Sequence, residues 1–286
     1  MSNELENIFK KGSKTYFTSS LLFPPAVRKD VVQLYAFVRT ADDFVDNVPA
    51  DPEGFLLFAN RYRQSVHSGP SGDRIIDAFL DLSRRYCFDP DWAEVFLQSM
   101  EWDLHRSSYR TMDELIAYMN GSAEVIGLFM TRILGLPASA EAYARMQGRA
   151  MQLINFIRDI QEDQLLGREY LPEENRRPGL LCEKTAKMYP GEFKKYVRAL
   201  LQTYHVWQKE AEQGYKFIPR RYLIPIKTAA DMYLWTANTI EKDPFVVYRR
   251  KVKPAKPAIF WQALRNVIVT RRGGDPHAEE DARGSQ

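Results

Sequence analysis

The sequence contains little of what marks several common classes of protein. Its two cysteines, Cys87 and Cys182, stand far apart and in no metal-ligand spacing, so we expect a reducing compartment and no disulfide framework. The four histidines are scattered and form no zinc motif. No apolar run reaches the about 18 residues of a membrane span, and the stretch after Met1 lacks the basic and apolar regions of a signal peptide. We therefore expect a cytoplasmic protein.

Glycine-rich phosphate motifs and strand signals are also missing. The chain contains neither GxGxxG nor GxxxxGK and shows no alternation of strand and helix patterns, which argues against the common nucleotide-binding α/β folds. The formal net charge is +3, which is too small to argue for nucleic acid. We therefore expect no nucleic-acid partner, and the composition leaves the oligomeric state open.

Helical signals, by contrast, are nearly continuous. One pattern begins at Pro24-Pro25, because proline favours the first turn of a helix, and runs to about Asp46. Further helices are predicted over 52–67, 73–86, 90–104, 112–135, 138–164, 190–218 and 222–242, and 167–181 is predicted to be irregular. With no linker and no internal repeat, the pattern predicts one all-α domain over 1–272, a helical bundle around a central cavity. The polar segment 273–286 is predicted to be disordered.

Two acidic motifs in apolar surroundings carry most of the functional information. On a helix, positions three, four, seven and eleven residues apart share a face. Two sets of side chains are related in this way, and they are Tyr35, Arg39, Asp42 and Asp46, and Gln152, Asn155, Asp159 and Asp163. Carboxylates one turn apart repel each other, and they do so more strongly when desolvated. Two such pairs among Phe, Val and Ile therefore predict a bound cation.

The residue types indicate which cation and which ligand. Carboxylate and amide oxygens without His or Cys form a hard ligand set that favours Mg²⁺. Arg39 and Arg158 accompany the two motifs, and Asp–Mg²⁺–phosphate bridges beside arginine are a common way to hold a diphosphate. A metal-bound diphosphate leaves readily, and an apolar, aromatic cavity shields the resulting carbocation. This combination indicates isoprenoid chemistry.

Plainer interpretations stand beside this one. A single DxxxD pair is most often a solvated helix face. Asp43 lies about 100° from the Asp42 face, so a surface charge is as good an interpretation as a supporting role. Ordinary core tyrosines would explain Tyr35, Tyr118 and Tyr233, and close helix packing would explain Gly121 and Gly127. The cluster Met100-Glu101 with Asp103 is interpreted as part of a helix surface and is assigned no role.

Both motifs resemble those of the squalene/phytoene synthase family. Residues 39–46, RTADDFVD, are similar to its first aspartate-rich motif, and residues 152–163, QLINFIRDIQED, are similar to its second. The following residues 167–172, GREYLP, resemble the GR-x-YLP tail of that second motif. Weaker similarity lies at residues 13–16, 118–123 and 126–127 and at Tyr233 and Arg250. The resemblance therefore extends over roughly residues 10–270.

The resemblance implies a single all-α isoprenoid-synthase domain with two or three Mg²⁺ ions. It implies head-to-head condensation of two prenyl diphosphates through a cyclopropyl diphosphate. Tyr118 and the four motif aspartates would be catalytic, with Tyr118 near the reacting centre. The implied metal ligands are Asp42, Asp46, Asn155, Asp159 and Asp163. The residues implied to surround the diphosphates are Ser13, Lys14, Thr15, Tyr35, Arg39, Gln152, Arg158, Tyr233 and Arg250. Gly12 departs from relatives that place a histidine there, so a diphosphate contact is expected to be missing or to come from backbone.

The last step decides the product. Proton loss gives a triene such as phytoene or dehydrosqualene, whereas hydride from NADPH gives squalene, so NADPH is expected only for squalene. The GREYLP tail looks more like the carotenoid branch, which favours two geranylgeranyl diphosphates and phytoene. Farnesyl diphosphate with a C30 product is the alternative. Chain length is expected to depend on the bulk at the cavity floor, and the candidates are Phe17, Leu21 and residues 125–133.

Two further classes compete with this assignment. A non-catalytic assembly factor of mitochondrial respiratory complexes also resembles the family, but it has no need for both intact DxxxD pairs. Head-to-tail prenyltransferases and terpene cyclases carry DDxxD-type or NSE-type motifs in other contexts, and the 167–172 tail speaks against them.

Finally, the basic stretch 249–256, with Trp261 and Arg265 beyond it, is either an ordinary solvated helix and loop or a peripheral contact with an anionic membrane.

Overall fold

The structure, a computed structural model, describes residues 2–272, together with their side chains except those of residues 2, 3, 14, 15, 256 and 269–272. The predicted tail over 273–286 lies outside the described residues. Within the described range, helices joined by short turns make up the fold, and Ser108 and Glu169 form an isolated parallel bridge rather than a strand. The all-α class predicted from the sequence is confirmed.

The helices follow one another with few long connections. In chain order they are α1 (Ser2–Gly12), α2 (Lys14–Ser20), α3 (Pro25–Asp46), α4 (Pro52–Ser68), α5 (Arg74–Tyr86), α6 (Pro90–Trp102), α7 (Met112–Met119), a π turn (Asn120–Glu124), α8 (Val125–Ile133), a 3₁₀ turn (Ala138–Ala140), α9 (Glu141–Arg158), α10 (Ile160–Leu165), α11 (Glu183–Met188), α12 (Pro190–Glu212), a 3₁₀ turn (Gln213–Phe217), α13 (Arg220–Lys242), α14 (Val246–Arg249) and α15 (Lys256–Arg272).

Local chemistry explains why many helices begin where the sequence predicts. Four of them start on a proline at the first helical position, where the missing N–H costs nothing. Asp51, Asp73 and Asp89 cap α4, α5 and α6 by accepting hydrogen bonds from the first free backbone amides. These boundaries are therefore fixed by short-range interactions.

Two predicted helices are interrupted, and five helices were not predicted. The 112–135 helix contains a π turn at Asn120–Glu124, and the 138–164 helix breaks at Asp159, whose φ of −99° and ψ of 14° are not helical. The additional helices are α1, α2, α11, α14 and α15. The π turn coincides with Gly121, where a Cβ would lie 2.0 Å from Ser99 Oγ. Packing against α6 therefore decides the local geometry there.

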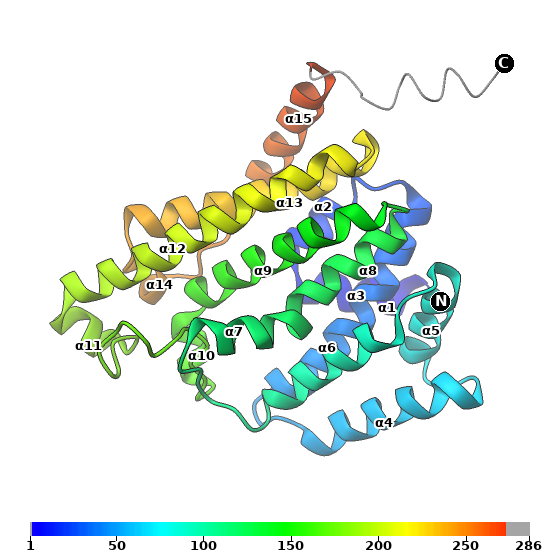
Figure 1. Ribbon diagram of the computed structural model, residues 1–286, viewed down its shortest axis with the longest axis horizontal. Coiled ribbons are helices and arrows are strands. Elements are labelled where there is room, and N and C mark those ends of the chain that lie inside the picture. Colours follow the sequence, from blue (N-terminus) through cyan, green and yellow to red (C-terminus); the bar gives the residue numbers. More distant parts are fainter. Residues whose placement is uncertain (1, 273–286) are drawn as a thin grey trace.

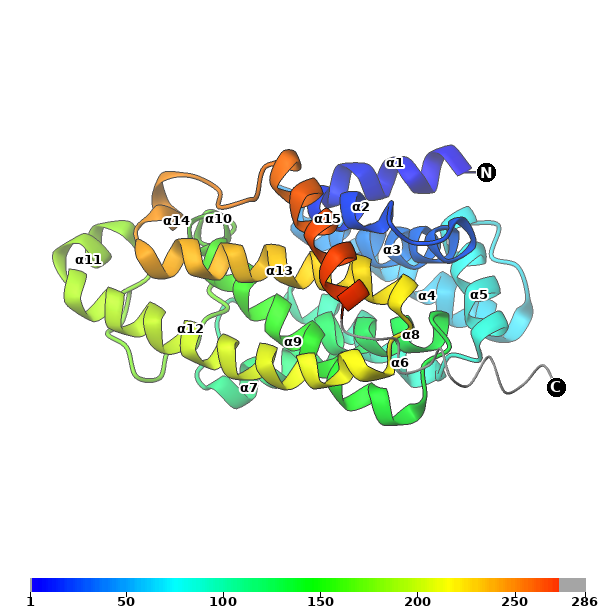
Figure 2. The ribbon, with the colours of Figure 1, turned by 90° about the horizontal axis from the view of Figure 1, so that it is seen from above.

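Helix α9 occupies the centre of the bundle. It contacts α7, α8, α12 and α13, and Figure 1 shows α12 and α13 along one side of it and α8, α6 and α4 on the other. The view from above shows α1 and α2 on one face of the bundle and α7 on the opposite face (Figure 2). The buried apolar side chains form two clusters. One joins α1, α3, α4, α5, α6 and α8, and the other joins α7 and the helices from α9 to α14.

Small residues let α8 and α9 approach each other closely. A Cβ on Gly127 would lie 2.2 Å from the Ala144 carbonyl oxygen, and one on Gly148 would lie 2.4 Å from that of Ala123. Gly127 also lines the cavity described below. The close-packing interpretation of this glycine is therefore correct, and the contact fixes the position of α9.

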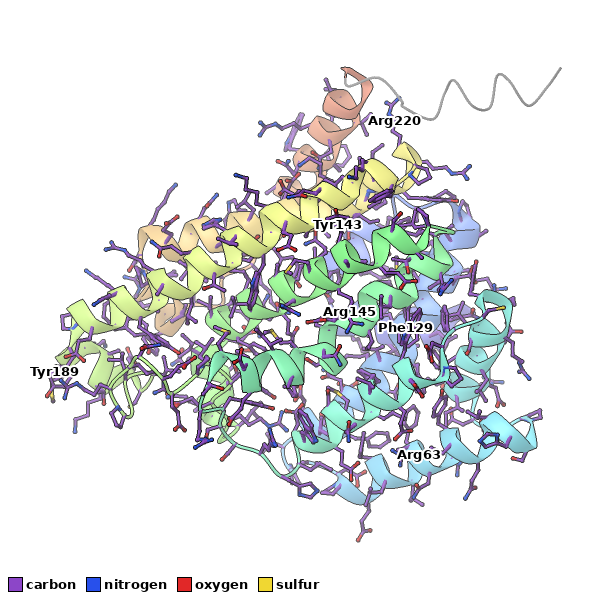
Figure 3. The ribbon with its side chains drawn as sticks, in the orientation of Figure 1. Arg63, Phe129, Tyr143, Arg145, Tyr189 and Arg220 are labelled. Atoms are coloured by element: carbon purple, nitrogen blue, oxygen red, sulfur yellow. The ribbon has the colours of Figure 1, made fainter. Side chains whose placement is uncertain are left out.

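A buried ion-pair cluster holds the π turn against α9. Glu124 is only 1% exposed, and it accepts hydrogen bonds from Arg145 Nε at 3.1 Å and from Arg149 Nε at 2.6 Å. Arg145, labelled in Figure 3, also donates to the Asn120 side chain at 2.6 Å. Two arginines thus compensate one buried carboxylate, and removal of both would leave that carboxylate buried and unpaired.

Candidate active site

A cavity of about 510 Å³ lies between the two apolar clusters. Helices α2, α3, α6, α8, α9 and α13 supply its walls. Most of its surface is apolar. The carboxylates of both acidic motifs lie together at one end of the cavity, which we call the acid end and define by Asp42, Asp46, Asp159 and Asp163. Both sets of predicted motif side chains therefore reach the same space. The predicted central cavity is present, and its lining carboxylates are concentrated at the acid end.

The first motif occupies the last turns of α3, which ends at Asp46. Arg39 lies between two carboxylates, with Nη1 2.6 Å from Asp42 Oδ2 and Nη2 2.5 Å from Asp43 Oδ1. Asp42 and Asp46 line the cavity, whereas Asp43 does not and its side chain is 44% exposed. Asp43 therefore acts as a surface carboxylate that pairs with Arg39, which combines the two interpretations considered from the sequence.

The second motif spans the junction of α9 and α10. Asp159 sits at the break and is bound through both of its carboxylate oxygens by the neighbouring Arg158 guanidinium. Lys251, in the strand-like segment before α15, lies 3.6 Å from Asp159 Oδ1 and also pairs with Glu162. Despite the break, the predicted set of four side chains stays together, since Gln152, Asn155, Asp159 and Asp163 all line the cavity.

Arg168 connects the two motifs. Its guanidinium donates from Nη1 to Asp46 Oδ1 at 2.6 Å and from Nη2 to the Val45 carbonyl, while its backbone N–H donates to the Asp163 carbonyl at 2.8 Å. The residue is 9% exposed. The 167–172 loop thus joins the carboxyl end of α3 to α10 across the acid end.

A second carboxylate network lies beside this bridge. Asp103 is 7% exposed, and it accepts hydrogen bonds from Tyr118 at 2.7 Å and from Tyr170 at 2.8 Å. Arg168 Nη1 donates to the Tyr170 hydroxyl at 3.2 Å. Asp103, Tyr118 and Tyr170 all line the cavity. The interpretation of Asp103 as a helix-surface residue is therefore wrong, because the turn after α6 directs it inward.

Burial and repulsion raise the pKa of several carboxyls at the acid end. Burial, followed by the Asp46 carboxylate, raises the pKa of Asp42 to about 8. Burial, followed by the Asp159 and Asp46 carboxylates, raises the pKa of Asp163 to about 8. Burial also raises the pKa of Asp103 to about 6, against the opposing effect of its tyrosine hydrogen bonds. The protein alone does not cancel the repulsion between these carboxylates, and a bound cation would reduce it.

Tyrosines and amides line the cavity next to the acid end. Tyr233 donates to the Tyr16 hydroxyl at 2.9 Å, and Tyr16 donates to Met151 Sδ at 3.5 Å. Asn155 donates to Gln152 Oε1 at 3.1 Å, but its own Oδ1 is buried and has no hydrogen-bond partner among the described atoms. A buried amide oxygen without a donor is costly, and here it points to a ligand.

Residues 9–257 match the sequence profile described as squalene/phytoene synthase. This chain is a member of that family. Among its relatives, the 15-cis-phytoene synthase of Pantoea ananas is 29% identical over 282 residues, which cover 93% of this chain and 91% of the relative. The 15-cis-phytoene synthase of Enterobacter agglomerans is 30% identical over 235 residues, or 78% of this chain and 80% of the relative.

Solved structures show the same fold. A dehydrosqualene synthase solved with a ligand superposes with a TM-score of 0.83 at 20% identity, covering 94% of this chain and 95% of that one. A squalene synthase from Alicyclobacillus acidocaldarius superposes with a TM-score of 0.75 at 17% identity, covering 84% and 93%. The isoprenoid-synthase helical fold expected from the motifs is therefore confirmed. As a family member, the chain is a prenyltransferase that joins prenyl diphosphates head to head.

The acid end of this synthase fits the divalent metal that the family uses. Its donors are hard oxygens, one of them the unpartnered Asn155 Oδ1, and burial and neighbouring carboxylates raise the pKa of two of its carboxyls, an effect that a bound cation would oppose. Among the described residues, no three Asp, Glu, His or Cys side chains form a ready-made ion cage. Mg²⁺ typically uses one or two carboxylates and completes its shell with water and phosphate oxygens, so two facing pairs suit it.

One residue that the resemblance places at the diphosphates lies elsewhere in the structure. Arg250 is exposed and lies outside the cavity lining, because the chain leaves α14 in an extended conformation with φ −164° and ψ 153°. The neighbouring Lys253 lines the cavity instead. Ser13 lines the cavity and caps α2 by accepting from the Tyr16 amide at 3.2 Å. The side chains of Lys14 and Thr15 lie outside the described residues.

The departure at Gly12 has a steric explanation. A Cβ there would lie 2.4 Å from the Tyr35 hydroxyl and 3.0 Å from Arg39 Cδ. Tyr35, held by a stacked ring contact with Phe9 at 4.1 Å, therefore occupies the space that a larger residue at position 12 would need. Tyr35 and Gly12 both line the cavity.

The cavity floor differs from the prediction in part. Phe17 packs against Phe9 and Leu21 is 55% exposed, and neither lines the cavity. Their neighbours Ser19 and Ser20 line it instead. From the predicted segment 125–133, the lining residues are Ile126, Gly127, Met130 and Thr131. The far end is closed by residues that the sequence did not single out, and they include Tyr143, Gln147, Tyr215 and Ile218.

Sequence reasoning assigned no role to four residues near the acid end. Arg168 and Tyr170 belong to the GREYLP segment, so the motif itself contained the signal. Asp103 and Lys253 had no local signal, because only the fold brings them to the cavity.

In the part of the chain that the structure describes, no helix is long and apolar enough to cross a membrane.

Proposed function

We propose that this synthase condenses two geranylgeranyl diphosphates head to head, through a cyclopropyl diphosphate, to phytoene. The relatives named 15-cis-phytoene synthase support this choice of product, and the length of the cavity supports the C20 substrate. The cavity follows α9 from Asp159 to Tyr143, a residue labelled in Figure 3. That stretch of helix corresponds to about 24 Å at 1.5 Å per residue.

The length of the cavity carries the proposal. An extended chain advances about 1.2 Å per backbone bond, so a C20 prenyl chain reaches roughly 18 Å and a C15 chain roughly 13 Å on the same basis. A C20 chain with its diphosphate at the acid end therefore fills the distance to Tyr143. A C15 chain would leave the far end of the cavity empty, which costs contact energy along its walls.

The acid end would bind the two diphosphates. Asp42, Asp46, Asn155, Asp159 and Asp163 would hold Mg²⁺. When bound, Mg²⁺ supplies Lewis-acid stabilisation of the charge on the departing diphosphate. The side chains proposed to contact the diphosphates directly are Ser13, Lys14, Thr15, Tyr35, Arg39, Gln152, Arg158, Tyr233 and Lys253.

The remaining wall would protect the reacting carbons. The Phe156 and Tyr170 rings stack at 4.4 Å and, with Tyr118, face the cavity beside the acid end, where ring faces stabilise an allylic cation and exclude water. The Tyr118 hydroxyl donates a hydrogen bond to Asp103, so the Tyr118 oxygen can still accept one. We assign this oxygen to the neighbourhood of the carbons that lose a proton.

The test is an incubation of the purified protein with Mg²⁺ and either C15 or C20 prenyl diphosphate, with and without NADPH, followed by identification of the extracted hydrocarbon. A C40 triene from the C20 substrate, unchanged by NADPH, is the expected result. A C30 product from farnesyl diphosphate alone would overturn the chain-length assignment and indicate dehydrosqualene or, with NADPH, squalene. Asp46→Asn serves as the control, since a product that it still forms at the same rate does not come from this site.

A further inference from the structure

Helix α15 carries its large apolar side chains on its outer face. Four of them are exposed, with Phe260 at 66%, Trp261 at 65%, Leu264 at 42% and Ile268 at 47%. At about 100° of rotation per residue, these four positions fall within an arc of about 100° on one side of the helix. We refer to these four residues as the outer face of α15.

The inner face of α15 is held by polar bonds. Gln262 and Asn266 donate to Asp231 Oδ2 on α13 at 2.7 and 2.8 Å, and Asn266 also donates to Thr228 Oγ1 at 3.2 Å. Among the described side chains of α15, Ile259 and Ala263 are the buried apolar ones there. A helix that packs on a protein normally buries its large apolar residues and exposes its polar ones. In α15 this distribution is largely reversed.

The position of α15 keeps the outer face accessible. The helix packs on α2 and α13 and extends from the edge of the bundle (Figures 1 and 2). Arg220, labelled in Figure 3, donates from Nη2 to the Val267 carbonyl at 3.4 Å near the far end of the helix. The outer face is therefore presented by a helix that is anchored along its length.

The charge of this region has one sign. Residues 256–272 include Lys256, Arg265, Arg271 and Arg272 and contain no Asp or Glu. Arg265 is exposed and lies one helical turn after Trp261, beside the outer face. The segment 249–253 precedes the helix and adds the exposed Arg250, whereas Arg249 and Lys251 pair with carboxylates and Lys253 lines the cavity. Apolar side chains framed by basic ones match the surface of an anionic lipid bilayer.

We propose that the outer face of α15 docks this enzyme on anionic lipid membranes, with Phe260 and Trp261 entering the boundary between headgroups and acyl chains. Two other occupants fit less well. Residues 273–286 contain no Leu, Ile, Val, Met, Phe, Tyr or Trp, so they supply no apolar cover. A second copy related by two-fold symmetry would place like-charged faces together without a carboxylate from either α15.

Docking at this face places the cavity next to the lipid phase. The two helices beneath α15 also wall the cavity, through Ser19 and Ser20 on α2 and through Ile226 and Ala229 on α13. Prenyl chains and their hydrocarbon products partition into bilayers, so the membrane would supply the prenyl substrate and receive the hydrocarbon product. This consequence holds for C15 and C20 chains alike and does not depend on the chain length proposed above.

The experiment is co-sedimentation of the full chain at low salt with vesicles of phosphatidylcholine and phosphatidylglycerol in equal parts, and with vesicles of phosphatidylcholine alone. We expect strong binding to the anionic vesicles that weakens as salt is added. The double variant Phe260→Ser/Trp261→Ser should bind at least about tenfold more weakly, because two large apolar side chains are removed from the contact. Leu57→Ser/Val206→Ser removes side chains of 68% and 64% exposure from α4 and α12 and should bind like the wild type.

A conservative variant separates docking from folding. Trp261→Phe should keep the binding and lose the fluorescence shift that Trp261 shows on entering the membrane. Three results would overturn the proposal. They are no wild-type binding to anionic vesicles at low salt, equal binding of the wild type and the α15 double variant, and a lipid-free dimer, detected by light scattering, that the α15 double variant dissociates.

Discussion

Arg168 and Asp46 form a 2.6 Å ion pair across 122 residues of sequence. The pair joins the loop after the second acidic motif to the last residue of the helix that carries the first. Asp46 is thus held in place by a residue that also binds the backbone of Val45 and Asp163. Arg168 therefore connects the two proposed metal-binding pairs, through its guanidinium at the α3 end and through its backbone N–H at α10.

Replacement of Arg168 by glutamine should lower kcat by about 10² or more, because the two carboxylate pairs lose their common support and the proposed Mg²⁺ ligands move apart. Steady-state rates across a Mg²⁺ titration measure the effect, and the Mg²⁺ concentration for half-maximal rate should rise as well. Arg63→Gln is the matched control, since Arg63, labelled in Figure 3, pairs with Glu94 on the exposed surface at 2.5 Å. An Arg168→Gln enzyme with wild-type Mg²⁺ dependence would contradict this role.

Stability should depend on pH through Asp42 and Asp163. Their pKa values rise from the ordinary 3.8 to about 8 in the folded chain, so the folded protein binds these protons more tightly than the unfolded one. The unfolding free energy of the metal-free protein should therefore fall as pH rises from about 4 to about 8. Mg²⁺ should restore it above pH 8 by about 2 kcal/mol or more, or roughly 4 °C in Tm.

Thermal unfolding at pH 5, 7 and 9, with EDTA or with Mg²⁺, measures this dependence. In the variant Asp42→Asn/Asp163→Asn both titrating groups are gone, and its stability curve should be flatter over the same range. If Mg²⁺ stabilises the wild type equally at pH 5 and pH 9, the two carboxyls do not bind it in competition with protons.

The close approach of α9 to the π turn makes Gly148 intolerant of a side chain. Gly148→Ala would place a Cβ 2.4 Å from the Ala123 carbonyl oxygen, so the backbone must shift and the unfolding free energy should fall by about 2–3 kcal/mol. Denaturant unfolding gives the value. Gly191→Ala on α12 is the control, because nothing lies within 4 Å of a Cβ there, and a gain in helix propensity makes it neutral or slightly stabilising.

The far end of the cavity offers a direct test of chain length. Ala144 lines the cavity one residue from Tyr143, and Ala144→Phe would fill the space that we assign to the last isoprene unit. The ratio of kcat/KM for the C20 substrate to that for the C15 substrate should fall by about tenfold or more, as expected for loss of apolar contact of this size. Competition between the two diphosphates in one reaction measures the ratio. An unchanged ratio would mean that the prenyl chain ends elsewhere.

Short-range signals explain what the sequence predicted about the fold. The helix ending at Asp46 and the proline-initiated helices lie where capping and periodicity place them. The break at Asp159 and the π turn at Asn120–Glu124 were not predicted, because both accompany side-chain interactions that helical periodicity does not show. In the first case the Arg158 side chain binds the Asp159 carboxylate, and in the second α6 packs against Gly121.

The candidate site divides in the same way. The two motif sets could be predicted from helical spacing, and all eight of their side chains line the cavity. Asp103 and Lys253 could not, because each follows a helix end whose direction is decided by packing. Arg250 is a different case, because its position in a familiar motif did not determine which of two nearby basic side chains faces the cavity, and in this structure Lys253 does so.

The two helices that carry the acidic motifs both finish at the acid end, α3 at Asp46 and α9 at Arg158. Each helix carries a macrodipole whose carboxyl end bears about half a negative charge. These two ends add their field to that of the four aspartates, and they do so through backbone that no side-chain substitution removes. Together with the aspartates, the helix ends oppose the positive charges of Arg39, Arg158 and Arg168 at this end. The first species drawn to this end of the cavity is a cation, and a diphosphate is attracted only after it.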